Sequence, residues 1–162
     1  MSLSSKRSIR LFYLCGASGT YRIIAASAIL MGTSGLVMTL SKILLVDDDD
    51  NIRAIAEISL EDDYKVVVAS SGAEALVQAE KLKPDLILLD VMMPGMDGKA
   101  TFAKLQENPA LARIPVIFMT AKVLSHEIDF YLRLGAAGVI TKPFDPMRLG
   151  SDIQEIWARC KG

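Results

Sequence analysis

The stretch KILLVDDDDNIR, Lys42 to Arg53, is central to the fold prediction, because it places four consecutive aspartates directly after a short apolar run. The run KILLV is typical of a strand that is covered on both faces. Two carboxylates about 4 Å apart repel each other by about 4 kcal/mol at an effective dielectric constant of about 20. A cluster of this kind therefore requires positive charge from elsewhere in the chain or from a bound ion.

Strand-like and helix-like segments alternate from Lys42 onward. The predicted strands are 42–46, 64–70, 84–90, 114–120 and 138–141. The predicted helices have inward stripes at Ile52, Ile55, Ala56, Ser59 and Leu60, at Leu76, Ala79 and Leu82, and at Leu149, Ile153, Ile156 and Cys160, with two further helices over 99–107 and 125–134. This alternation predicts an α/β fold, a doubly wound five-stranded parallel sheet with strand order 2-1-3-4-5.

Several polar residues are predicted to begin helices and not to form a site. Ser71 and Glu74 have the spacing of a capping box. Asp97 is predicted to be the N-cap of the helix that follows it. Asp49 and Asp50 are interpreted as exposed N-cap or first-turn residues.

Polar residues end four of the five predicted strands. Asp47 and Asp48 follow the first strand, Asp90 ends the third, Thr120 ends the fourth and Lys142 follows the fifth. The carboxyl ends of parallel strands lie at one edge of a sheet, and ligands bind there. Because strands one and three are neighbours in the order 2-1-3-4-5, we expect the three aspartates to converge at this edge.

The chemistry expected of this edge is phosphoryl transfer. Lys142 offsets one negative charge, and a hard divalent cation, Mg²⁺ or Mn²⁺, would offset more through carboxylate oxygens. Asp90 is the natural nucleophile, since an ionised carboxylate can form an aspartyl phosphate. Thr120 can donate a hydrogen bond to a phosphoryl oxygen.

Four motifs, ILLVDDDDNIR, LILLDVMMPGMDG, IPVIFMTA and GAAGVITKPFD, occur in an order and spacing that resemble the receiver domain of two-component response regulators. The resemblance covers residues from about Ser41 to Arg159 and is to the chemotaxis-regulator-like family. It implies a flavodoxin-like receiver fold. It also implies that Asp90 is the phosphoacceptor, that Asp48 binds the metal directly, and that Asp47 does so directly or through water. The main-chain carbonyl of Met92 would complete the protein's metal ligands.

The resemblance assigns roles to the last two strands as well. Thr120 would be the switch hydroxyl, and Lys142, joined to Pro143 by a cis peptide bond, would pair with the phosphoryl group. The family often has Tyr or Phe where this chain has Val139, so the usual coupling of that aromatic to the threonine cannot operate here. Met92 and Lys122 occupy positions where side chains commonly control the access of water to the acyl phosphate.

The function implied is that of a stand-alone receiver in the cytoplasm, which catalyses only its own phosphorylation and dephosphorylation. Its donor would be a phosphohistidine on a histidine kinase or phosphotransfer protein. Its readout would be a protein bound at the face of the fourth helix, fifth strand and fifth helix. Two alternatives remain open: a phosphorylation-independent adaptor, favoured by Val139, and a Mg²⁺-dependent phosphohydrolase, disfavoured because Met92 stands where such enzymes carry a second acid.

Residues 1–40 are predicted to be an N-terminal extension, and 41–162 the receiver domain. The extension carries a net charge of +4 and the remainder −5, which argues against bulk nucleic-acid binding. Eighteen uncharged residues, Ile23 to Leu40, barely reach the length of a membrane span. A non-native or dispensable segment before Met38, a disordered or partner-binding tail, and membrane contact are the alternatives. Two cysteines, Cys15 and Cys160, do not make a disulfide framework, which favours a reducing compartment.

Overall fold

The computed structural model describes residues 39–121 and 124–161. Most of the predicted extension, up to and including Met38, and Lys122 lie outside these residues. No helix within the described ranges is both long enough and apolar enough to cross a membrane. The predictions for the extension therefore stay predictions.

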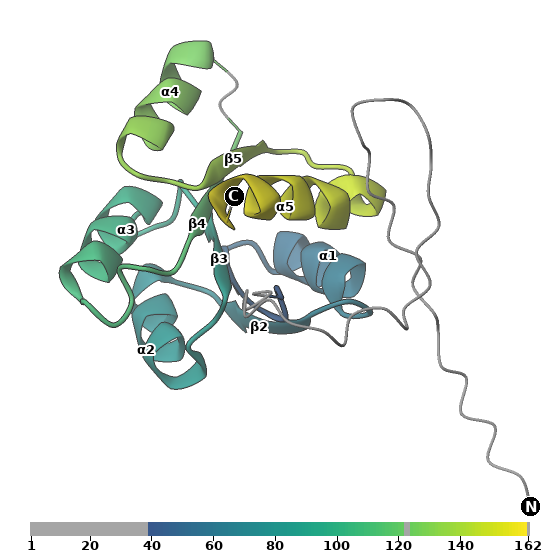
Figure 1. Cartoon of the computed structure of the whole chain (residues 1–162), viewed down its shortest axis with the longest axis horizontal. Helices are drawn as coiled ribbons and strands as arrows, with labels where there is room; N and C mark the ends of the chain where they lie inside the picture. The colour runs from purple at the N-terminus through teal and green to yellow at the C-terminus, as the bar shows by residue number, and fades with distance from the viewer. Residues whose placement is uncertain (1–38, 122–123, 162) are drawn as a thin grey trace, which may run out of the picture. The chain divides into compact units, whose positions relative to one another are not determined.

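Five parallel strands and five helices alternate along the chain, as predicted (Figure 1). The strands are β1 (Lys42–Val46), β2 (Lys65–Ala69), β3 (Leu86–Asp90), β4 (Val116–Thr120) and β5 (Gly138–Thr141). The helices are α1 (Asp50–Leu60), α2 (Gly72–Leu82), α3 (Gly98–Glu107), α4 (Ser125–Arg133) and α5 (Pro146–Lys161). The strand order is β2-β1-β3-β4-β5, so the predicted doubly wound topology is confirmed.

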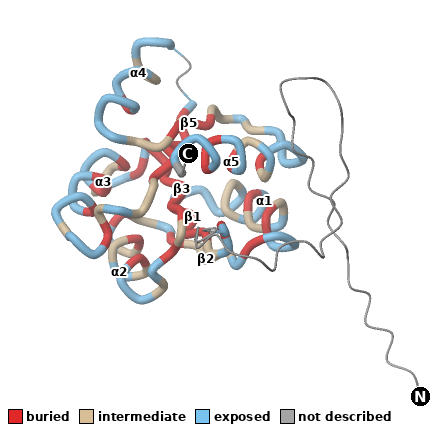
Figure 2. The backbone as a smooth tube through the Cα atoms, in the orientation of Figure 1, coloured by how far each residue is buried: buried red, intermediate tan, exposed pale blue. Residues whose placement is uncertain are grey.

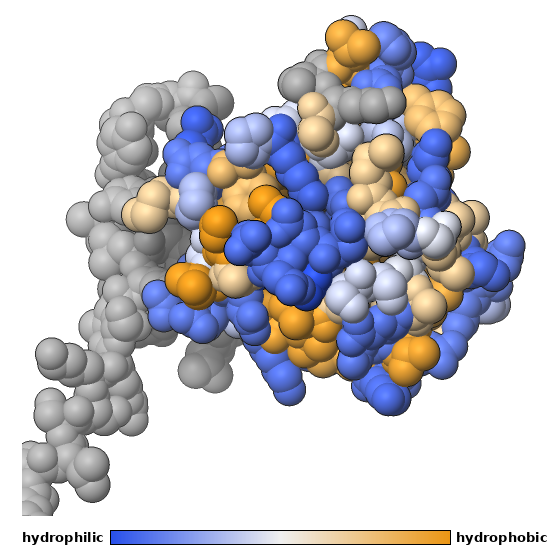
Figure 3. All heavy atoms as spheres, turned by 180° about the vertical axis from the view of Figure 1, so that it is seen from behind, coloured by the Kyte–Doolittle hydropathy of each residue, from blue (hydrophilic) through white to orange (hydrophobic). Residues whose placement is uncertain are grey.

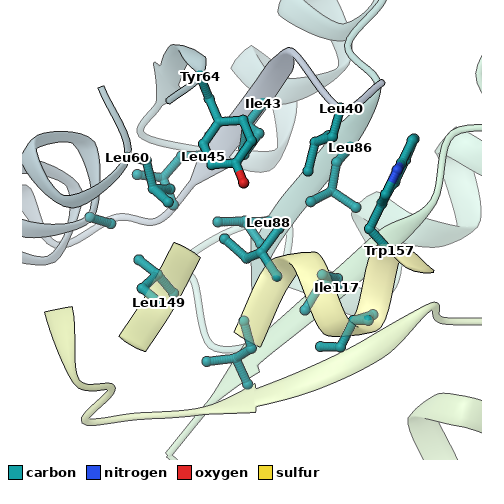
Figure 4. Packing of buried hydrophobic residues seen from close by; sticks show 14 of the residues in the cluster. Leu40, Ile43, Leu45, Leu60, Tyr64, Leu86, Leu88, Ile117, Leu149 and Trp157 are labelled. Atoms are coloured by element: carbon teal, nitrogen blue, oxygen red, sulfur yellow. The ribbon is translucent and has the colours of Figure 1, made fainter. Parts of the chain in front are cut away.

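Helices cover both faces of the sheet, with α1 and α5 on one face and α2 and α3 on the other (Figure 1). Successive strand residues alternate between these faces. Ile43 and Leu45 of β1 pack with α1 and α5, whereas Leu44 and Val46 pack toward α2 and α3. Figure 4 shows the first of these cores, in which Trp157 of α5 lies at one side, next to Leu40 and Leu86.

The predicted inward stripes are wrong at two positions, both at the margin of a helix face. Ile55 of α1 is exposed, because the buried contacts of this helix are made by Ala56 and Leu60. Cys160 is exposed near the end of α5, and the large ring of Trp157 supplies the buried contact instead. The spacing of apolar residues shows which side of a helix faces the sheet, but it does not show how wide the contacting surface is.

The predicted helix starts are confirmed, with one difference in the capping box. The Asp49 carboxylate accepts hydrogen bonds from the first turn of α1, and the Asp97 carboxylate accepts one from the Ala100 amide at 2.7 Å. Ser71 caps α2 by accepting from the Glu74 amide at 3.3 Å. The Glu74 carboxylate, however, accepts from the amide and hydroxyl of Ser70, one residue earlier than in a standard capping box.

At the amino-terminal edge of the sheet, Asp85 joins the starts of β1 and β3. Its Oδ2 accepts from the Ser41 amide at 3.0 Å, the Ser41 hydroxyl at 2.9 Å and the Lys42 amide at 2.8 Å. Partial burial alone would raise the pKa of Asp85, but the bonds from Lys42 and Ser41 outweigh burial and hold the pKa below its usual value.

We predict that Asp85→Asn lowers the free energy of unfolding by about 1 kcal/mol near neutral pH, because charge-assisted hydrogen bonds are weakened. Since the pKa of Asp85 is depressed in the folded protein, this stabilisation is present above the unfolded value and disappears as pH falls through the folded value. Urea unfolding of both proteins at neutral and strongly acidic pH measures the difference. Asp62→Asn, at an exposed turn residue, is the control. A deficit for Asp85→Asn that persisted at acidic pH would contradict this account.

Candidate functional site

Three aspartates from two neighbouring strands meet at the carboxyl edge of the sheet. Asp47 and Asp48 follow β1, and Asp90 ends β3. A carboxylate oxygen of each lies within 4.8 Å of the other two. Asp47 and Asp90 are buried, whereas Asp48 is exposed. The structure thus brings together the three carboxylates that the strand ends predicted, with one of them open to solvent.

Lys142 reaches this cluster from the end of β5. Its Nζ donates to Asp47 Oδ2 at 2.5 Å and to Asp90 Oδ1 at 2.9 Å. The Lys142 side chain is 16% exposed, so both ion pairs are largely shielded from water. The Lys142 amide donates to the Thr120 carbonyl at 2.8 Å, which ties the lysine backbone to β4. The peptide bond to Pro143 is cis, as the family resemblance implied.

Burial and neighbouring charge determine the protonation of this pair. Burial is the main influence on Asp90 and raises its pKa, and the charge of Asp47 raises it further, while Lys142 and the Met92 amide act in the opposite direction. Burial alone would lower the pKa of Lys142, but its bonds to Asp47 and Asp90 outweigh burial and raise it. Lys142 is therefore a fixed positive charge at neutral pH.

Three carboxylates and one ammonium leave this cluster with a charge of −2 when all four groups are ionised. Carboxylate oxygens are the ligands that Mg²⁺ prefers in proteins. The oxygens are close enough together for a single ion to contact them, and Asp48 is accessible to one that keeps part of its water shell. The donor set therefore fits a hard divalent cation.

Two other predicted site residues, Thr120 and Met92, lie at or just after the ends of the central strands. Thr120 ends β4 and is buried, one residue past Met119, the register partner of Asp90. Met92 follows Asp90 by two residues and is 64% exposed. His126 is exposed at the start of α4. Lys122 is outside the described residues.

Arg53 supports the site in a way that the sequence prediction missed. Its guanidinium donates to the Asp47 carbonyl at 2.6 Å and forms an ion pair with Asp50 in the first turn of α1. The Asp49 amide donates to Asp47 Oδ1 at 3.0 Å. These bonds fix the turn that carries Asp47 and Asp48. The sequence signal was the spacing of Asp50 and Arg53, which places opposite charges one helical turn apart.

Gly98, at the start of α3, is the second contribution that was missed. A Cβ at this position would lie 2.2 Å from the Asp90 carbonyl oxygen and 2.8 Å from the Cα of Val91. The Gly98 amide donates to the Val91 carbonyl at 3.0 Å, which closes the loop after β3. Only a residue without a side chain lets α3 begin this close to the backbone of Asp90.

The family model described as "Response regulator receiver domain" matches residues 43–154. Among curated relatives, the alkaline phosphatase synthesis transcriptional regulatory protein PhoP of Bacillus subtilis is 40% identical over 119 residues, which are 73% of this chain and 49% of that protein. Response regulator PleD of Caulobacter vibrioides is 38% identical over 117 residues, covering 72% of this chain and 26% of its own. The chain spans about half the length of the curated relatives that it matches first.

Solved structures give the same comparison in three dimensions. The chemotaxis protein CheY4 of Vibrio cholerae is 31% identical with a TM-score of 0.68, over 73% of this chain and 99% of that one. A putative response regulator from Chloroflexus aurantiacus is 32% identical with a TM-score of 0.67, over 74% of this chain and 99% of that one.

We predict that Gly98→Ala lowers the free energy of unfolding by about 1–3 kcal/mol, because the new methyl group overlaps the Asp90 backbone and cannot be relieved by a rotamer change. The amide resonances of Asp90 and Val91 should shift with it. Gly150→Ala in α5 is the control, since the new Cβ would lie at an ordinary 4.0 Å from the Leu60 side chain of α1. That variant should be neutral or more stable by up to about 1 kcal/mol. Equal effects at the two glycines in denaturant unfolding would show that the close approach to Asp90 is unimportant.

Proposed function

This chain belongs to the family of response regulator receiver domains, and from that premise we propose that it accepts a phosphoryl group on Asp90. The donor is a phosphohistidine of a sensor kinase or of a histidine phosphotransfer protein. The Asp90 carboxylate oxygen attacks phosphorus, the phosphorus–nitrogen bond breaks, and its electron pair stays on the imidazole. The product is an aspartyl phosphate. The chain is thus a signalling phosphoacceptor with no separate substrate.

The observation that carries this proposal is the cluster of Asp47, Asp48 and Asp90 around the ammonium of Lys142. A buried nucleophilic carboxylate, a fixed cation beside it and two further carboxylates suit phosphoryl transfer, in which negative charge must be neutralised at several oxygens. Asp47, Asp48 and the main-chain carbonyl of Met92 would hold Mg²⁺ or Mn²⁺ together with Asp90. When bound, the ion neutralises charge on the phosphoryl oxygens.

Lys142 and Thr120 act on the phosphoryl group after transfer. The Lys142 ammonium is bonded to Asp47 and Asp90 in the unphosphorylated chain. After transfer it forms an ionic contact with the phosphoryl oxygens. The Thr120 hydroxyl donates a hydrogen bond to one of them. Phosphorylation thereby changes the ends of β4 and β5. The face formed by α4, β5 and α5 then presents a different surface to a protein partner.

The setting of this reaction is proposed on the same grounds. Residues 41–162 form the receiver, and residues 1–40 are dispensable for its chemistry. The acidic body of the domain suits protein partners in the cytoplasm and not nucleic acid or a membrane surface. A phosphohydrolase is disfavoured, because Met92 supplies no second acid two residues after Asp90.

We expect the full chain to gain the mass of one phosphoryl group when it is incubated with acetyl phosphate and Mg²⁺, and Asp90→Asn to gain none. An amide cannot act as the nucleophile at this position. Asp62→Asn, at an exposed turn residue away from the cluster, should be labelled like the wild type. Intact-mass spectrometry measures the adduct. A wild type that stayed unlabelled would support the phosphorylation-independent adaptor instead.

Removal of Mg²⁺ with a chelator should abolish this labelling. Substitution of Asp48, which lies in the cluster, should also weaken Mg²⁺ binding, whereas substitution of an aspartate outside the cluster should not. Asp48→Asn removes a carboxylate from the cluster and should weaken Mg²⁺ binding at least about tenfold, whereas Asp62→Asn, at an exposed turn residue, should leave it unchanged. Amide shifts of residues 47–49 and 90–92 during a Mg²⁺ titration report the affinity. Equal weakening by both variants would place the ion elsewhere.

A further inference from the structure

Helix α4 is held to the domain differently from the other helices. Tyr131 is the only buried residue among Ser125–Arg133, all of which the structure describes. In contrast, α1, α2 and α3 each bury two or more residues. The N-cap of α4 is Leu124, whose apolar side chain makes no capping hydrogen bond. Most of α4 carries the colour of exposed residues in Figure 2, and Figure 3 shows hydrophobic side chains on the surface in this region.

The one buried residue of α4 contacts the strand that leads to the site. The ring of Tyr131 packs on Phe118 of β4, with centroids 5.0 Å apart and an interplanar angle of 44°. Phe118 is fully buried and also packs on Phe102 of α3, at 5.4 Å. Because side chains alternate along a strand, Phe118 and Thr120 lie on the same face of the sheet. Two positions along one strand therefore separate the anchor of α4 from the buried threonine of the site.

β5, the strand next to β4, has no aromatic side chain opposite Phe118. Val139 of β5 is the register partner of Phe118 and is only partly buried against the same core. The aromatic contact with Phe118 on this side comes from α4 instead. Phe118 therefore connects the strand that ends at Thr120 to Tyr131, the one buried residue of α4.

We infer that Tyr131 couples the Asp90 site to α4: a change at Thr120 shifts Phe118, and the Tyr131 ring follows it and moves the helix. This inference rests on the proposed function, because phosphorylation is what acts on Thr120. It assigns to Tyr131 a positioning role and no contact with the phosphoryl group. The strand–helix aromatic pair takes the place of a coupling through residue 139.

Amide hydrogen exchange of α4 in the full chain tests the inference, with Mg²⁺ alone and with Mg²⁺ and beryllofluoride as the phosphoryl mimic. Tyr131→Leu keeps an apolar anchor but removes the ring, and should reduce the beryllofluoride-dependent change in α4 exchange at least about fivefold. Tyr131→Phe keeps the ring and should respond like the wild type. Phe130→Leu is the matched control, since Phe130 is half exposed and its ring contacts Tyr131 only from outside the core.

Binding of beryllofluoride is followed in the same samples through the amide shifts of Asp90 and Val91. If Tyr131→Leu binds the mimic and α4 responds in full, or if Phe130→Leu loses the response equally, the inference is overturned and the proposed function stands. If the wild type does not bind the mimic, both are overturned. Should Tyr131→Leu lose protection of α4 without the mimic, Tyr131→Met, which has an unbranched apolar side chain, replaces it under the same criteria.

Discussion

The two ion pairs of Lys142 are the interaction on which the arrangement of the site depends. Asp47 and Asp90 are buried at the ends of the central strands, where an unpaired carboxylate would cost several kcal/mol. In the order β2-β1-β3-β4-β5, the lysine starts at the sheet edge and reaches past β4 to both of them. The hydrogen bond from the Lys142 amide to the Thr120 carbonyl fixes the backbone from which this side chain extends. Lys142 therefore connects the ends of four of the five strands, β1, β3, β4 and β5.

This arrangement neutralises only part of the charge, and the imbalance gives the site its chemistry. A buried pair of one lysine and one aspartate would be neutral and would need no further ion. Here a second buried carboxylate shares the lysine, and a third, Asp48, remains exposed beside them. The cluster is therefore too acidic to be complete by itself and open enough to admit a cation. Arg53 does not relieve the imbalance, because it donates to the carbonyl of Asp47 and pairs with Asp50.

The fold and the convergence of the acidic residues could be predicted from the sequence because both follow from strand ends. In a parallel sheet, residues that end strands meet at one edge whatever the loops between them do, so Asp47, Asp90 and Lys142 were placed by topology alone. Gly98 was missed because its role depends on the separation of two backbone segments, which no residue pattern reports. Ile55 and Cys160 were misplaced because helical spacing gives a direction but not the width of the surface opposite.

The anchoring of α4 also lay beyond the sequence pattern. Its apolar residues, among them Phe130, Tyr131 and Leu132, are adjacent and do not indicate which of them faces the sheet. Only the packing of Phe118 between α3 and α4 singles out Tyr131. The sequence shows directly that residue 139 is not aromatic. It does not show that the ring of Tyr131, on α4, contacts Phe118.

The helix caps have an electrostatic consequence for the same edge of the sheet. Helices that follow parallel strands begin near the strands' carboxyl ends, and each helix start carries about half a positive charge from its aligned peptide dipoles. In α1 and α3 this partial charge already faces a carboxylate of its own, Asp49 and Asp97 respectively. The macrodipoles of these two helices are thus compensated locally. These two helix starts therefore do little to reduce the negative charge that Lys142 leaves at the central aspartates, and that remaining charge favours a cation at this edge.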